Sequence, residues 1–145
     1  MALDATKTIN GSFGTCWHEG AWLTNVTGVE ANIEIDKEEI KRAGTRWVGH
    51  KTMALTGTGT ISSYKLTTAF AKLIAQVTDD NMAPYTTELI VKLADPESYG
   101  VERVRLKGVQ FDTIPLVNYE VGSIVEEELP FTFAGFEYLD EITAE

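Results

Sequence analysis

The stretch Tyr64–Val77, YKLTTAFAKLIAQV, has the one clear helical pattern of the sequence and decides the fold. Its apolar residues recur at the spacing of one helix face: Leu66, Ala69, Phe70, Leu73, Ile74 and Val77. Thr67 or Thr68 is the expected cap at its start, and Asp79–Asn81 followed by Pro84 is expected to end it. Because both flanks have strand patterns, we expect this helix, over about 66–77, to cover the open face or an open end of a β-sheet.

The chain before the helix begins with a polar, Gly-rich segment, residues 1–14, which is predicted to be a flexible N-terminal arm. Thr15–Trp17 and Trp22–Thr24 are predicted to pair as a hairpin with Gly20 in its turn. Val29–Asp36 alternates strictly between apolar and polar residues. This alternation predicts a strand with one dry face and one wet, acidic face.

The alternation stops in Lys37–Lys51, KEEIKRAGTRWVGHK, which is charged and contains an isolated Trp47. Because long connections without regular structure are often functional, and Trp and Arg are enriched at interfaces, we expect a projecting loop that docks on a partner. A long strand rich in threonine then follows over Thr52–Ser62. Its two glycines, Gly57 and Gly59, are expected to let the strand bend and to relieve crowding within it.

After the helix, strands are predicted over Thr87–Leu93, Val104–Phe111, Ile114–Val121 and Val125–Phe133. The apolar parity shifts within the second of them, so Gly108 is expected to mark a β-bulge. Seven or eight short strands, most of them at hairpin spacing, and one helix indicate a mainly β fold. We therefore expect an antiparallel β-sandwich or barrel with the helix against it.

Composition sets broad limits on function. With 145 residues, the chain fits a single domain, and its net charge of −10 argues against tight binding of nucleic acid. No secretory signal or membrane-spanning run is expected, and the single cysteine is expected to remain reduced in a cytosol. Basic residues concentrate between Lys37 and Lys51 and acidic residues after Lys107, so copies are expected to attract one another head to tail.

Motifs for catalysis or metal binding are not evident. Cys16 and His18 are two possible metal ligands, which is too few for a zinc site. Gly57–Thr60 lacks the Gly-Lys-Ser/Thr ending of a phosphate loop. Glu126–Glu128 is a run of carboxylates on an expected strand, where neighbours point to opposite faces, so an acidic surface is favoured over an acid–base pair. We expect neither enzymatic activity nor a cofactor.

Several blocks together resemble the tail tube proteins of contractile-tailed phages and of phage-like particles such as defective prophages and tail-like bacteriocins. They occur in the family's order and cover most of the chain: Val29–Lys37 (VEANIEIDK), Gly49–Ser62 (GHKTMALTGTGTIS), Tyr64–Phe70 (YKLTTAF), Glu102–Asp112 (ERVRLKGVQFD) and Glu126–Phe136 (EEELPFTFAGF). The Cys16–Glu19 hairpin matches no family motif. The ordered set, rather than any single block, supports the resemblance.

The resemblance implies two antiparallel sheets packed nearly orthogonally and flanked by one helix. It also implies that six copies form a ring with a continuous inner β-barrel, and that rings stack into a tube inside a contractile sheath. The implied partners are other copies of the chain, the sheath protein, the baseplate or tail initiator, and the tape-measure protein. DNA is implied only as cargo that is not bound, and no membrane is involved. The protein is expected in the tail, after synthesis and assembly in the cytoplasm of a bacterial host.

Two sets of residues follow as candidate sites. The subunit or ring interface is expected to include a basic and an acidic group: Lys41, Arg42, Arg46, Trp47, His50 and Lys51, with Glu126, Glu127 and Glu128. A channel that passes DNA should lack cations, because each phosphate–cation contact adds a salt-dependent attraction. Two wet strand faces are candidates for its wall: Glu30, Asn32, Glu34 and Asp36 on one strand, and Thr52, Thr56, Thr58 and Thr60 on another.

Two other classes of protein remain open from the sequence. One is a lipocalin-like β-barrel that binds a small ligand, with its large aromatic residues lining a cavity. The other is an enzyme with an acidic pair on a barrel. Both alternatives predict a compact monomer or dimer, whereas the tail tube hypothesis predicts a large assembly.

Overall fold

The computed structural model describes residues 3–65 and 68–143. The described chain contains eight strands, one α-helix and three short 3-10 helices. The strands are β1 Gly14–His18, β2 Ala21–Trp22, β3 Val26–Lys41, β4 Val48–Tyr64, β5 Thr87–Leu93, β6 Glu102–Phe111, β7 Glu126–Phe133 and β8 Gly135–Asp140. The helices are η1 Ala5–Lys7, η2 Gly11–Phe13, α1 Ala69–Ile74 and η3 Ala75–Thr78. The prediction of a mainly β chain is confirmed.

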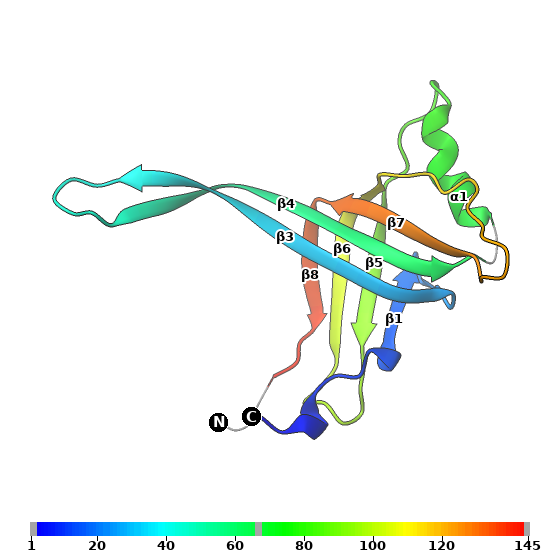
Figure 1. The fold of residues 1–145 in the computed structure, drawn as a ribbon, viewed down its shortest axis with the longest axis horizontal. Coiled ribbons are helices and arrows are strands. Elements are labelled where there is room, and N and C mark those ends of the chain that lie inside the picture. The colour runs from blue at the N-terminus through cyan, green and yellow to red at the C-terminus, as the bar shows by residue number, and fades with distance from the viewer. Residues whose placement is uncertain (1–2, 66–67, 144–145) are drawn as a thin grey trace.

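All strand pairs are antiparallel, and the eight strands form one open sheet. The strand order is β2-β1-β5-β6-β7-β4-β3, and β8 pairs with β6 away from this path. Only Gln110 and Phe111 at the end of β6 pair with β7, so β6 connects two parts of the sheet. Figure 1 shows β3, β4 and β7 running across β8, β6, β5 and β1.

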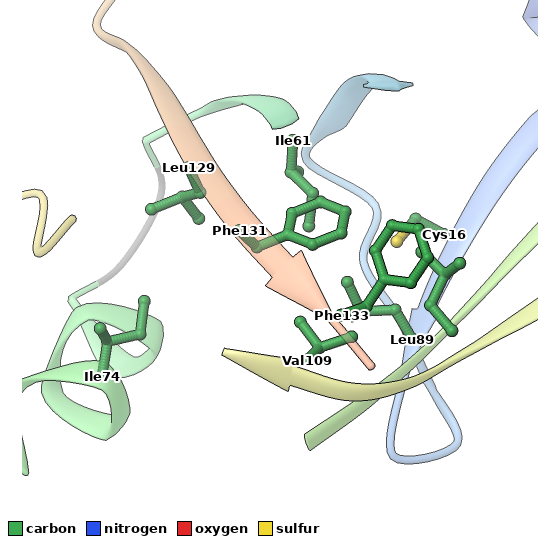
Figure 2. Packing of buried hydrophobic residues seen from close by; sticks show 9 residues of the cluster. Cys16, Ile61, Ile74, Leu89, Val109, Leu129, Phe131 and Phe133 are labelled. Atoms are coloured by element: carbon green, nitrogen blue, oxygen red, sulfur yellow. The ribbon is translucent and has the colours of Figure 1, made fainter. Parts of the chain in front are cut away.

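The hydrophobic core contains side chains from both parts of the sheet. Phe131, Leu89 and Val109 are completely buried, and Figure 2 shows Phe131 and Phe133 of β7 among side chains of β1, β4, β5 and β6. The other buried apolar residues are Cys16, Ile61, Ile74, Leu106 and Leu129. Eight of the nine buried apolar residues belong to strands and one, Ile74, to α1, so the core forms mainly between the two parts of the sheet.

Gly57 and Gly59 allow the phenyl rings of β7 to pack across β4. Gly57 pairs directly with Phe133, and Gly59 pairs with Phe131. A Cβ atom at Gly59 would lie 2.4 Å from Cζ of Phe131 and 2.5 Å from the backbone oxygen of Glu30. A Cβ at Gly57 would lie 2.6 Å from a ring carbon of Phe133. The expectation that these glycines relieve crowding is confirmed, and the crowding comes from neighbouring aromatic rings.

Two local predictions are confirmed, one of a hairpin turn and one of a β-bulge. His18 pairs with Ala21, so Glu19 and Gly20 form the two-residue turn of the β1–β2 hairpin, with positive φ values of 50° and 82°. In β6 the register against β5 shifts by one residue, and Gly108 there has a φ of 65°. Gly20 in the turn and Gly108 in the bulge both have positive φ values, which glycine adopts at low cost.

The predicted helix is shorter and less embedded than its pattern suggests. Leu66 and Thr67 lie outside the described residues, α1 covers only Ala69–Ile74, and the chain continues as the 3-10 helix η3. Ile74 is buried, whereas Leu73 and Val77 are 42% and 48% exposed. Figure 1 shows α1 at one end of β4 and β7 rather than lying across the sheet. Of the two expected placements, the one across a sheet face is wrong, because the two parts of the sheet cover each other, and the helix lies at an end of the sheet instead.

The predicted loop over Lys37–Lys51 is mostly strand. Residues 37–41 belong to β3 and residues 48–51 to β4, and only residues 42–47 form the connection between them. Pairing of Lys41 with Val48 brings the hairpin to its end. Neither face of the ribbon is buried over these residues, so charged side chains lie on both faces. The sequence therefore lacks the apolar–polar alternation on which the strand prediction depended. The hairpin does project from the body, as Figure 1 shows.

Two further segments differ from expectation. The strand predicted over Ile114–Val121 is absent from the described residues, although this segment connects β6 to β7. The segment predicted as an arm contains η1 and η2, and the N–H of Asn10 donates to Oδ2 of Asp95 at 2.8 Å. Its flexibility stays a prediction.

Candidate assembly surfaces

The polar sides of β3 and β4 form a single surface. Directly paired residues of antiparallel strands point to the same side of a sheet. The pairs here are Glu30 with Thr60, Asn32 with Thr58 and Glu34 with Thr56, and we call these six residues the polar ribbon face. The two candidate channel faces of the sequence are therefore one face over this length. Thr132 of β7 pairs with Thr58 and extends it.

This face has hydroxyl, amide and carboxylate groups but no cation among its six residues. Asn32 donates from Nδ2 to Oε1 of Glu30 at 2.9 Å, so the amide is held against a carboxylate. The remaining two candidates lie further along: Asp36 pairs with Ala54, and Thr52 pairs with Lys37 after a shift in register. Lys37 is therefore the first cation beside the candidate channel residues.

Beyond Gly57, the β3–β4 ribbon loses its third strand. β7 pairs with β4 only from Gly57 to Tyr64, so the ribbon from Ile35 to Leu55, which we call the distal arm, is a two-stranded hairpin. Ile35 and Leu55 are paired with each other and are 51% and 66% exposed. Met53 is 60% exposed. An isolated two-stranded hairpin is marginally stable in water, so this arm lacks the burial that stabilises the rest of the sheet.

The basic residues predicted to form an interface lie on the distal arm. All of them are exposed: Lys41, Arg42, Arg46, Trp47, His50 and Lys51. Trp47 is 79% exposed in the connection between β3 and β4. Trp and Arg are residue types enriched at protein interfaces, so an exposed Trp47 beside Arg46 in the chain is typical of an interaction surface.

The acidic residues predicted to form the same interface lie at the opposite end of the ribbon. Glu126 and Glu128 are exposed and pair with Tyr64 and Ser62 at the end of β4. Glu127 pairs with Ser63, and Lys65 Nζ lies 3.4 Å from its Oε1. Strand pairing thus separates the basic and acidic groups by most of β4, roughly 50 Å at the usual rise per residue. Within one chain they do not meet.

Cys16 and His18 belong to a buried structural cluster. His18 Nε2 lies 2.8 Å from Oη of Tyr85 and 3.1 Å from Oγ1 of Thr87, and both hydroxyls lie 3.3 Å from Oε1 of Glu19. Burial lowers the pKa of His18 and raises that of the Cys16 thiol to about 11, so the thiol remains protonated at neutral pH. Among the described residues, no group of three or more His, Cys, Asp or Glu side chains is placed to hold a metal ion.

Sequence patterns do not identify the partners of His18. Thr87 begins β5 and Tyr85 precedes it, and both approach His18 because β5 pairs with β1. The only available signal is that Thr87 shares the parity of the buried Leu89.

Within residues 3–65 and 68–143, no helix is both long and apolar enough to cross a membrane.

An open antiparallel sheet, an unsupported hairpin and separated charged groups are typical of a structural protein with exposed surfaces for association. The family model described as phage tail tube protein matches residues 1–140, so the chain belongs to this family. Tail tube proteins are structural components of phage or phage-like tails and not enzymes. Family membership confirms the resemblance and replaces both alternatives, the ligand-binding barrel and the enzyme.

Individual relatives agree with this assignment. The chain is 36% identical over 144 residues to the phage-like element PBSX protein XkdM of Bacillus subtilis (strain 168), covering 99% of this chain and 98% of that protein. Its fold is similar to a chain in the sheath–tube complex of the PVC extracellular contractile injection system, with a TM-score of 0.71, 7% identity and coverage of 94% and 98%. A chain in the tail of an empty GTA particle, refined with C6 symmetry, gives a TM-score of 0.55 at 10% identity, with coverage of 92% and 100%.

Proposed function

We propose that this protein forms the inner tube of a contractile phage tail or phage-tail-like particle, as stacked hexameric rings around a channel for DNA or injected material. The observation that carries this proposal is the β3–β4 ribbon. It has a continuous polar face without cations in the body and an uncovered arm at its end. In this proposal, the β3–β4–β7 part and the β8–β6–β5–β1 part act as two nearly orthogonal sheets flanked by α1.

The polar ribbon face is proposed to line the channel. Its carboxylates repel phosphates, and its threonines hold a layer of water without providing a positive charge that would retain DNA. Rotational repetition turns each residue of this face into a ring of like side chains. Repulsion between the carboxylates is screened by solvent in a wide channel, so it costs a few tenths of a kcal/mol per pair.

The distal arm is proposed to contact a copy in the adjacent ring. Its tip carries Arg42, Arg46 and Trp47, and the other end of the ribbon carries Glu126 and Glu128. Because these groups lie at opposite ends of each subunit, stacking copies in the same direction brings opposite charges together. Contact with a neighbour would also cover Ile35 and Leu55.

The proposed partners outside the tube follow from its position. The neighbour with a similar fold comes from a sheath–tube complex, which supports a contractile sheath around this tube. A baseplate or tail initiator would begin assembly, and a tape-measure protein would fill the channel before cargo. We place synthesis and assembly in the cytoplasm of the bacterial host.

Electron microscopy of native particles tests the proposal. Labelling with an antibody, or assignment of the chain to the density, should locate the protein in the inner tube, as rings with six copies. Location in another part of the particle would refute the function.

A second test addresses the stacking contact by charge exchange. Tubes should fail to form when Arg42 and Arg46 are both replaced by Glu, and should form again when Glu126 and Glu128 are also replaced by Arg. Normal assembly of the variant with Glu at positions 42 and 46 would refute the proposed tip contact but not the proposed tube function.

A further inference from the structure

The connection between β6 and β7 exposes an unusual amount of apolar surface. Five of its side chains are at least 73% exposed: Leu116, Val117, Tyr119, Val121 and Ile124. Soluble proteins tolerate single exposed apolar residues, but five of them within nine positions of the chain indicate an interaction surface. The group does not overlap the distal arm or the polar ribbon face.

This connection starts on the side of β7 that β4 does not occupy, where the last residues of β6 pair with β7. At its start, the N–H of Asp112 donates to the oxygen of Pro130 in β7 at 2.9 Å. Further along, Lys65 Nζ lies 3.1 Å from the backbone oxygen of Leu116 and 3.4 Å from Oε1 of Glu127 in β7. Figure 1 shows the connection passing from the end of β6 toward the end at which β7 begins. It therefore runs opposite to β7 in direction.

The sequence of the connection has the pattern of a strand. Val117, Tyr119 and Val121 alternate with Asn118 and Glu120, and β-branched and aromatic residues favour extended backbone. Among the described residues, none accepts a hydrogen bond from the backbone N–H groups of 117–121. The segment thus has the side-chain pattern and the free backbone donors of a strand but lacks a partner strand.

A suitable partner edge exists on the opposite side of the same part of the sheet. β3 is the last strand of the order, and among the described strands it pairs only with β4. A free edge of this length is prone to pairing with another chain, so a stable assembly has to cover it. Both the free edge and the unpaired segment belong to every copy, which makes a second copy the natural occupant.

Strand direction favours this pairing. β3 and β4 are antiparallel, as are β4 and β7, so β3 and β7 run in the same direction. Rotation about a ring axis preserves strand direction along that axis. If β7 were the edge, it would meet β3 of the next copy in parallel. With the segment after β6 as a fourth strand, every junction becomes antiparallel, as in the rest of the sheet.

We propose that residues 116–121 become a strand on ring formation and pair antiparallel with the outer edge of β3 in the neighbouring copy. This inference rests on the proposed function and identifies the edges that join one subunit to the next. Pairing satisfies those N–H groups of the segment that face the neighbouring edge, and brings Val117, Tyr119 and Val121 close to the neighbour. The free subunit lacks this strand because its partner edge belongs to another molecule.

Amide hydrogen exchange on wild-type subunits and on assembled tubes tests the proposal directly. Peptides covering 117–121 should exchange roughly tenfold more slowly or better in tubes than in free subunits, since strand pairing protects amides. Peptides from β3 should gain protection as well. If residues 117–121 exchange equally fast in both states, the proposal is wrong while the tube function stands. If the protein is absent from the native tube, the proposed function itself fails.

Proline substitution gives an independent test. Tyr119→Pro and Glu120→Pro remove N–H groups that point to opposite sides of the segment, and Tyr119→Phe and Glu120→Ala are the matched controls. Because the segment is exposed and unpaired in the subunit, all four variants should keep the wild-type thermal midpoint. At least one proline variant should fail to form tubes, whereas both controls assemble. Normal assembly of both proline variants would overturn the proposal.

Discussion

The two halves of the β3–β4 ribbon consist of the same two paired strands but have opposite surroundings. Near the body, β4 has β7 as a second partner, and Gly57 and Gly59 lie against the phenyl rings of Phe133 and Phe131. In the distal arm the same two strands have no third strand, and apolar residues such as Leu55 are mostly exposed. The first half stabilises the subunit, and the second remains available to another molecule. Periodicity alone reports a strand with a dry face and does not report which molecule covers that face.

The largest effect expected from the close packing of the body half of the ribbon is on stability, at Gly59. Replacement of Gly59 by Ala should lower the free energy of unfolding by about 3 kcal/mol or more, because the added Cβ meets both a phenyl ring and the backbone oxygen of Glu30. Denaturant unfolding measures this change. Gly28→Ala is the matched control in the same ribbon, since a Cβ there has no atom within 4 Å, and its effect should be within about 0.5 kcal/mol. Equal effects at the two positions would contradict the difference between crowded and open sites.

A second prediction concerns assembly without loss of stability. Replacing Arg46 and Trp47 together by Ala should abolish tube formation while changing the free energy of unfolding by less than about 0.5 kcal/mol, since Trp47 is 79% exposed. Sedimentation and electron microscopy measure assembly, and thermal unfolding measures stability. A large drop in the thermal midpoint would show that the distal arm supports the body. Tyr99→Ala, another exposed aromatic, provides a control of the same kind on the body.

A third prediction concerns the polar ribbon face and leaves both folding and assembly intact. Tubes in which Glu30 and Glu34 are replaced by Lys should retain short DNA at low salt and release it as salt rises, because counterion release makes phosphate–cation contacts salt-dependent. Wild-type tubes should not retain it. Asp80→Lys with Glu97→Lys changes the charge equally away from the ribbon and should not cause retention by the channel. If both double variants retain DNA to the same extent, the polar ribbon face does not line the channel.

The smallest predicted effect is a pH dependence of stability from His18 in the body. Burial lowers the pKa of His18, so the unfolded chain binds a proton more readily than the folded chain. Its contribution to stability is therefore present above the ordinary histidine pKa of 6.5 and is lost as pH falls through that value. The free energy of unfolding of His18→Gln should fall less between pH 7.5 and about 6 than that of the wild type. The same substitution at exposed His50 on the distal arm is the matched control, and equal slopes for His18→Gln and the wild type would contradict the prediction.

Features that depend on a residue and its immediate neighbours could be predicted from the sequence. The turn at Glu19–Gly20, the bulge at Gly108 and the antiparallel strands all follow from local conformation and alternation. Alternation also identified the residues of the polar ribbon face, although only the strand register shows that the residues of β3 and β4 belong to one surface.

Features that depend on a distant partner could not be predicted. The apolar stripe of the helix predicts a covered sheet, yet only Ile74 among Leu73, Ile74 and Val77 is buried, because the sheet covers itself. The predicted strand at Ile114–Val121 has the right residues but no partner strand within the described part of the chain. Lys37–Lys51 shows the reverse case: its strands have partners but lack a buried face, so no alternation reveals them.

The continuity of β4 has a mechanical consequence. One uninterrupted strand, Val48–Tyr64, extends from the tip of the arm into the centre of the body. A force applied at the tip along the strand acts parallel to β4 and perpendicular to the hydrogen bonds that join it to β3 and β7. Those bonds are loaded together in shear rather than broken one after another, as they would be if the hairpin were peeled from its end. The arm can therefore transmit an axial load to the body along one continuous strand.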